Sequence, residues 1–89
     1  MTTGQPRAEE VLALVRQACA TVLELDPETV TRETRFVEDL RTDSLALVEI
    51  VEIVEEALAS RGLDAHIEDE ELDGLTTVGE AVDLAVARL

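Results

Sequence analysis

The chain has 89 residues, enough for one small domain, and its 21 acidic residues against seven arginines give a net charge of −14. The electric field of so negative a protein repels phosphate backbones and anionic lipids, and this repulsion excludes nucleic acids and membrane surfaces as partners. The apolar content of 46% is nevertheless too high for a disordered acidic tail. We therefore expect one folded domain over residues 1–89, with residues 1–5 as a flexible N-terminus.

The only cysteine, Cys19, excludes an internal disulfide and suits a reducing compartment. No apolar run is long enough to span a membrane, and residues 1–7 lack the basic and then apolar layout of a signal peptide. These features predict a cytoplasmic protein with no membrane partner, and we expect it to be a monomer.

The first expected helix covers residues 6–25. Its apolar side chains recur at the helical period, and Cys19 lies inside this stripe as a small buried core residue. The Asp26–Pro27 pair ends the helix, because a residue that precedes proline is pushed out of helical geometry. The same pair can start one short helical turn.

A long connection follows over residues 27–42, where the sequence has no sustained period. Irregular connections of this length are unusual in small domains and are often functional. Three apolar residues are expected to dock the connection onto the core: Phe36, Val37 and Leu40.

The second helix is expected to begin at Asp43 and Ser44, which supply a polar cap and the first turn. It continues to residue 59 without glycine or proline, and Gly62 then suits the left-handed position that follows a helix. Its glutamates are spaced three and four residues apart, where like charges repel. This cost has two explanations, solubility of the helix surface or binding of a cationic partner, for Glu49, Glu52, Glu55 and Glu56.

Two further helices complete the expected fold. Residues 68–75 predict a short third helix, and Thr77 with Glu80 has the spacing of a capping box that opens the last helix. Three long helices and one short helix predict an all-α, small four-helix bundle with a long loop between helices one and two.

The acidic residues are concentrated rather than spread. Residues 38–73 hold 13 acidic residues and two arginines, a net charge of −11, whereas the rest of the chain carries −3. A surface of this kind steers a basic partner toward it and accelerates encounter. The charge pattern therefore predicts partner proteins with basic docking patches, and a merely solvated acidic surface stays open as the alternative.

The ten residues from Phe36 to Leu45 read Phe-Val-Glu-Asp-Leu-Arg-Thr-Asp-Ser-Leu, and this segment resembles the phosphopantetheine attachment region of acyl carrier proteins. The order and spacing of the expected helices extend the resemblance over the whole chain. The resemblance implies a freestanding, non-catalytic carrier. It further implies that a separate phosphopantetheinyl transferase attaches 4′-phosphopantetheine from coenzyme A to Ser44, and that Asp43 helps to orient the metal ion or the transferase.

The resemblance also implies a surface for partner enzymes. Leu45 and Val48 match partly exposed apolar positions that pack against partners around the modified serine. Glu49, Glu55 and Glu56 match acidic positions that meet basic patches on the transferase and on ketosynthase, acyltransferase or acyl-ligase type enzymes. Simple core packing stays open as the alternative for Leu45 and Val48.

The motif also bears on the pathway. The sequence Asp-Ser-Leu-Ala-Leu at residues 43–47 is similar to carriers of polyketide assembly, and Ala46 stands where fatty-acid carriers often have aspartate. Arg41 stands where glycine is frequent in the family. We expect a carrier for polyketide-like or other specialised biosynthesis, with fatty-acid synthesis as the second reading. An aminoacyl or peptidyl carrier is the third, because its usual glycine-rich lead-in is absent.

A hydrolase with Ser44 as nucleophile is not favoured. His66 is the only histidine and lies beyond the second helix, and no glycine-flanked nucleophile elbow surrounds Ser44.

A calcium-binding module is the alternative from a different class. Asp69, Glu71, Asp73 and Glu80 fall at positions one, three, five and twelve of a loop like that of an EF-hand, with glycine at position six. Glutamate at position three departs from the pattern, and residues 62–67 interrupt the helix that would enter the loop.

Overall fold

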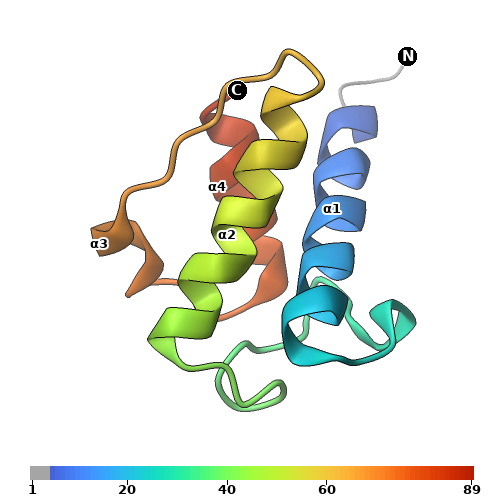
Figure 1. Ribbon diagram of the computed structural model, residues 1–89, viewed down its shortest axis with the longest axis vertical. Helices are drawn as coiled ribbons and strands as arrows, with labels where there is room; N and C mark the ends of the chain where they lie inside the picture. Colours follow the sequence, from blue (N-terminus) through green and yellow to red (C-terminus); the bar gives the residue numbers. More distant parts are fainter. Residues whose placement is uncertain (1–4) are drawn as a thin grey trace.

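The computed structural model describes residues 5–89 and contains four α-helices: α1 (Gln5–Leu23), α2 (Ser44–Ala59), α3 (Asp69–Leu72) and α4 (Val78–Ala87). Helices α1, α2 and α4 pack side by side, α1 runs opposite to the other two, and the short α3 lies at the edge of the bundle (Figure 1). The prediction of an all-α four-helix bundle is confirmed. The expected flexible N-terminus lies outside the described residues except at Gln5, where α1 begins.

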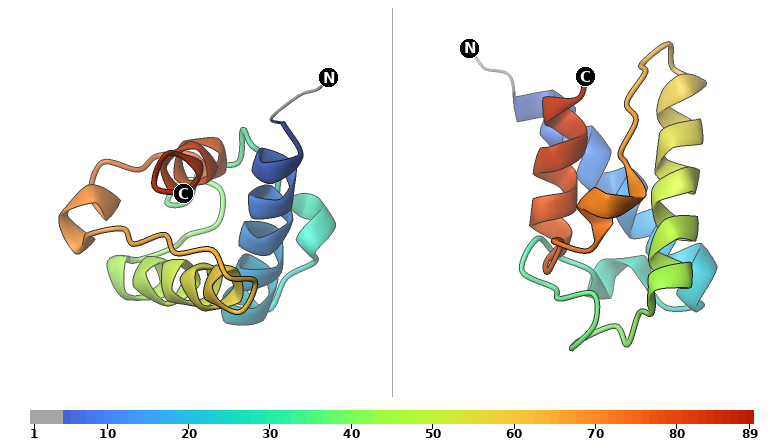
Figure 2. Two further views of the ribbon diagram at one scale, coloured as in Figure 1. Left: turned by 90° about the horizontal axis from the view of Figure 1, so that it is seen from above. Right: turned by 90° about the vertical axis from the view of Figure 1, so that its left-hand side faces the viewer.

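The core is built from the apolar stripes of the three long helices, which surround it when the bundle is seen from above (Figure 2). Cys19 is fully buried there, as predicted, and burial raises the pKa of its thiol to about 11. A thiol with this pKa stays protonated at neutral pH and is a poor nucleophile. Within residues 5–89, no helix combines the length and apolar character needed to cross a membrane.

Helix α1 ends two residues earlier than the sequence predicts. Glu24 takes a left-handed conformation with φ of 57°, and the Leu25 N–H donates to the Ala20 carbonyl at 3.3 Å. This arrangement closes the helix as a Schellman motif, a role in which glycine is the usual residue. Asp26 instead caps the following 3₁₀ turn, η1 (Pro27–Thr29), where its carboxylate accepts the Glu28 N–H. The short turn predicted at this position is therefore confirmed.

The predicted boundaries of the later helices agree more closely with the structure. Gly62, three residues after the last residue of α2, has φ of 79°, and the Leu63 N–H donates to the Leu58 carbonyl at 2.9 Å. Thr77 and Glu80 form the predicted capping box of α4. Helix α3 is shorter than the expected span of residues 68–75, because the Gly74 and Leu75 N–H groups donate to the carbonyls of Glu71 and Leu72, three residues back, and form turns instead of a further helical turn.

The long connection between α1 and α2 is held against the start of α4 by backbone hydrogen bonds. The Phe36 N–H donates to the Thr76 carbonyl, and the Gly79 N–H donates to the Arg32 carbonyl, each at 2.9 Å. A Cβ at residue 79 would lie only 3.0 Å from the Arg32 carbonyl oxygen, so glycine permits this close approach. The connection thus has a fixed path to the N-terminus of α2.

Only two of the three residues expected to dock this connection do so. Phe36 is 1% exposed and Leu40 is half-buried, but Val37 is 65% exposed, so the prediction for Val37 is wrong. A turn with hydrogen bonds from the Asp39 and Leu40 N–H groups to the Arg35 carbonyl places Val37 on its outer side. Apolar character alone does not distinguish the two sides of such a turn.

Candidate functional site

Ser44 is the first residue of α2, at the end of the bundle where the long connection arrives (Figure 1). Asp43 before it has an extended backbone, and its carboxylate accepts the Ala46 N–H at 2.8 Å, which caps the helix. Ser44 itself is exposed. The first N–H groups of a helix lack intrahelical partners and, with the helix dipole, favour an anion. The predicted attachment residue therefore lies where a phosphodiester on its hydroxyl would be stabilised.

The segment before Ser44 is fixed to the core. Phe36 is buried, and its carbonyl accepts the Thr42 N–H at 2.9 Å. The N–H of Arg35 donates to the Asp39 carboxylate at 2.8 Å, and this hydrogen bond is the main reason that the pKa of Asp39 is lowered. These contacts place Ser44 on a rigid element rather than on a loose loop.

Arg41 takes a left-handed conformation with φ of 57° two residues before the cap of α2. Its side chain is exposed. Left-handed backbone costs a non-glycine residue roughly 1–2 kcal/mol, so the position at which the sequence departs from the family pattern is one that favours glycine on conformational grounds.

Replacing Arg41 by glycine is expected to give a more stable protein than replacing it by alanine, by about 1 kcal/mol, because only glycine adopts positive φ without strain. Urea unfolding followed by circular dichroism measures the difference. The same pair of substitutions at Glu38, which lies in the same turn without positive φ, is the control and should favour alanine. Equal stability of the two Arg41 variants would contradict the argument.

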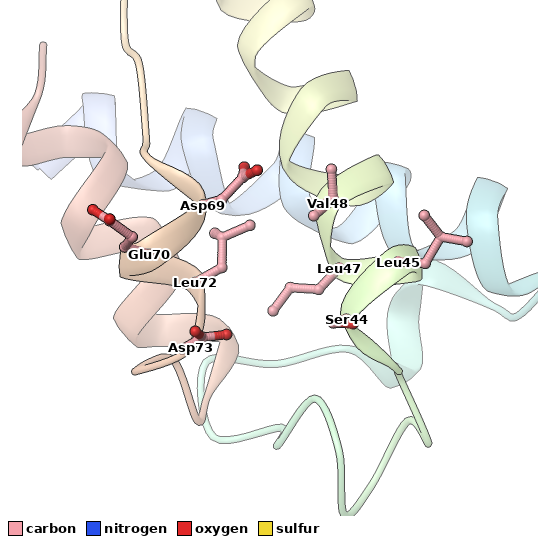
Figure 3. A pocket seen from close by; sticks show the side chains of 8 residues that line it. All are labelled: Ser44, Leu45, Leu47, Val48, Asp69, Glu70, Leu72 and Asp73. Atoms are coloured by element: carbon pink, nitrogen blue, oxygen red, sulfur yellow. The ribbon is translucent and has the colours of Figure 1, made fainter.

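A groove of about 380 Å³ lies between α2 and α3 beside Ser44 (Figure 3). Side chains of both helices line it, and those of Leu47 and Leu72 point toward one another across it (Figure 3). This volume is in the range of small-molecule sites. The lining residues are Ser44, Leu45, Leu47 and Val48 of α2, Asp69, Glu70 and Leu72 of α3, and Asp73, which directly follows α3. We call this feature the α2–α3 groove.

The outer face of α2 carries a second feature, which we call the α2 stripe. Its members recur at three- and four-residue spacing, as neighbours on one helix face do, and all are exposed. The residues of the stripe are Leu45, Glu49, Glu52, Ile53 and Glu56. Leu45 is 71% exposed, so core packing, the alternative for this residue, does not apply. Val48 is half-buried, and it both packs against the core, as its alternative has it, and lines the groove.

Glu55 lies apart from the stripe. Its carboxylate accepts the Ile67 N–H at 2.8 Å and ties the loop after α2 to the helix, and its side chain is 23% exposed. The motif does not include Glu52 or Ile53, and the spacing of the helix glutamates indicates only Glu52. The four-residue spacing of Ile53 from Glu49 is the signal in the sequence that could have found it.

Helix α3 is anchored to the end of α4. Arg88 forms an ion pair with Glu71, and its guanidinium also donates to the His66 carbonyl at 3.1 Å. The hydrogen bond from Arg88 is the largest cause of the lowered pKa of Glu71. His66 itself is exposed, and its Nε2 lies 3.2 Å from the Glu68 carboxylate. The imidazole therefore contacts Glu68 and not Ser44.

The four acids of the calcium alternative have separate roles. Glu71 binds Arg88, and Glu80 accepts the N–H groups of Thr76 and Thr77 in the cap of α4. Asp69 and Asp73 flank the α2–α3 groove. Across residues 5–89, no group of three or more potential ligand residues is arranged to hold a metal ion. The structure gives the calcium alternative no support.

Comparisons with known proteins agree with this geometry. Residues 13–85 match the family model described as phosphopantetheine attachment site. The chain is 45% identical over 78 residues to an acyl carrier protein of Rubrobacter xylanophilus, covering 88% of this chain and 90% of that protein. It is 39% identical over 80 residues to an acyl carrier protein of Phenylobacterium zucineum, covering 90% of this chain and 95% of that protein. The chain therefore belongs to the acyl carrier protein family, a family of non-catalytic carriers with covalently attached 4′-phosphopantetheine.

Proposed function

We propose that Ser44 is the attachment residue and that the chain carries acyl groups between the enzymes of a polyketide-like or other specialised biosynthetic pathway. The observation that carries the proposal is the exposed Ser44 at the N-terminus of α2, beside the α2–α3 groove. When bound, the phosphopantetheine group supplies a terminal thiol that holds an acyl group as a thioester.

The residues around Ser44 have distinct roles in this proposal. The free N–H groups at the start of α2 stabilise a phosphate on the serine oxygen, and Asp43 holds the helix end in place through its cap. Asp43 also presents a carboxylate to the transferase. The α2–α3 groove offers a partly apolar surface next to the attachment point, and the protein contributes binding and orientation while partner enzymes perform the chemistry.

Partner enzymes are proposed to dock on the α2 stripe. Glu49, Glu52 and Glu56 present carboxylates to basic patches, and Leu45 and Ile53 present exposed apolar side chains between them. Glu55, chosen for the same role from the sequence, is proposed to act through the loop that it fixes. The expected partners are phosphopantetheinyl transferase and ketosynthase, acyltransferase or acyl-ligase type enzymes.

The attachment site is tested by co-expression with a broad-specificity phosphopantetheinyl transferase and intact-mass measurement. The natural chain should gain the mass of one phosphopantetheine, and Ser44→Ala should gain none. Ser60→Ala is the matched control, because Ser60 is the only other serine and lies at the opposite end of α2, where its hydroxyl donates to the Ala57 carbonyl. Equal loading of Ser44→Ala and the natural chain would refute the assignment.

The proposed pathway rests on residues 43–47, in which Ala46 replaces the aspartate frequent in fatty-acid carriers. The loaded chain can be offered to one polyketide ketosynthase and one fatty-acid ketosynthase, each with its own carrier as the reference. A higher relative rate with the polyketide enzyme is expected. A higher relative rate with the fatty-acid enzyme would favour the second reading instead.

A further inference from the structure

Arg41 is the only basic residue between residues 36 and 60, the segment that contains Ser44 and α2. Its side chain is exposed, three residues before Ser44 in the sequence. Within the described part of the chain it forms no ion pair, whereas the guanidinium groups of Arg35 and Arg88 are bound to carboxylates. The charge of Arg41 is therefore available to an anion beside the attachment residue.

The three acidic residues within five positions of Arg41 already have partners. Arg35 forms ion pairs with Glu38 and with Asp39. The Asp43 carboxylate accepts a backbone N–H at 2.8 Å in the cap of α2. A phosphodiester on the attachment serine would be an anion in this segment that no other side chain of the segment neutralises.

The backbone around Arg41 keeps its side chain close to Ser44. The Cα atoms of the two residues are at most about 11 Å apart, the length of three fully extended residues. Hydrogen bonds from the Arg41 N–H to the Val37 carbonyl and from the Thr42 N–H to the Phe36 carbonyl hold the turn. The left-handed conformation of Arg41 is strained for any residue other than glycine, and strain of this kind is concentrated at functional sites.

We propose that the Arg41 guanidinium binds the phosphate of the phosphopantetheine group on Ser44 and holds it against the start of α2. The inference rests on the proposed attachment at Ser44. A guanidinium donates two parallel, charge-assisted hydrogen bonds to phosphate oxygens, and the free N–H groups of the helix add to them. The phosphate otherwise faces Asp43 and the acidic segment 38–73, where like charges repel. Arg41 thus offsets the repulsion between the acidic surface and the attached group.

Side-chain NMR of the isotope-labelled chain, before and after loading by the transferase, tests the contact. The Nε–H signal of Arg41 is identified by its loss in Arg41→Gln. In the natural chain at low ionic strength, loading should shift this signal and slow its hydrogen exchange with water. The Nε–H signal of Arg61, which is exposed beyond the opposite end of α2, is the internal control and should not move. The phosphorus NMR signal of the loaded chain should differ between the natural chain and Arg41→Gln.

Melting temperatures measure the energetic effect of the contact. The change in melting temperature on loading should be more favourable in the natural chain than in Arg41→Gln, by about 2–5 °C at low ionic strength. Sodium chloride should reduce this difference, because the pair is exposed and is screened. Arg41→Lys should retain most of the effect, since an ammonium also attracts phosphate as a point charge. Arg61→Gln removes the same charge and should behave as the natural chain does.

The possible failures are distinguishable. A natural chain that gains no phosphopantetheine mass contradicts the attachment at Ser44 and the inference with it. A natural chain that gains the mass while the Arg41 signal stays unchanged overturns the inference alone, and this comparison does not depend on how fast Arg41→Gln is loaded. Equal changes in melting temperature on loading Arg41→Gln and Arg61→Gln would likewise overturn the role of Arg41.

Discussion

Phe36→Ala is expected to lower the free energy of unfolding by about 3–5 kcal/mol, the usual cost of removing a buried phenylalanine ring. Phe36 is 1% exposed, and it is the only aromatic residue of the chain. Small domains are stable by only about 5–15 kcal/mol, so the variant should be largely unfolded in moderate urea. Far-ultraviolet circular dichroism during urea titration measures the loss.

The neighbouring residue provides the control. Val37→Ala removes an apolar side chain that is 65% exposed, and exposed substitutions usually change stability by about 0.5 kcal/mol or less. Similar losses in the two variants would show that the path of the long connection differs from the one described. The backbone carbonyl of residue 36, which accepts the Thr42 N–H, is kept in Phe36→Ala, but the buried ring that fixes it to the core is lost, so the backbone that leads to Ser44 should loosen.

The triple variant Glu49→Gln, Glu52→Gln, Glu56→Gln is expected to lower the kcat/KM of phosphopantetheinyl transferase by about tenfold or more at low ionic strength. Electrostatic steering changes association rates by factors of about 10–1000 and is screened by salt. The difference from the natural chain should therefore shrink steadily as sodium chloride is added. Initial rates of loading at several salt concentrations give this comparison.

The control for the triple variant removes the same charge elsewhere. Glu9→Gln, Glu10→Gln, Glu33→Gln changes three exposed glutamates outside α2 and should retain most of the natural rate. If both triple variants slow loading equally, the partner senses net charge and the α2 stripe has no specific role.

Elements with local signals could be predicted from the sequence. Asp43 caps α2 and Thr77 pairs with Glu80 because these contacts join residues three apart, and Gly62 marks the end of α2 for a similar reason. The end of α1 carried no such signal, because a glutamate takes the left-handed position. The path of the long connection depends on backbone hydrogen bonds between residues 32–36 and 76–79, which no side-chain pattern encodes.

The same distinction applies to the site. Ser44 and Asp43 lie in one continuous motif, so both could be found from the sequence. The groove requires Leu47 and Leu72 to face one another, and that contact depends on how the loop after α2 places α3. Glu55 fixes that loop by accepting the Ile67 N–H. Because the sequence does not reveal this long-range contact, Glu55 cannot be distinguished there from the neighbouring glutamates.

The most direct test of the account is fragment-ion mass spectrometry of the loaded protein. Cleavage after Arg41 and Arg61 releases residues 42–61, a peptide that contains both serines of the chain. Fragment ions should assign the phosphopantetheine mass to Ser44 and show Ser60 unmodified. Assignment of the group to Ser60, to a threonine or to another peptide would contradict the account.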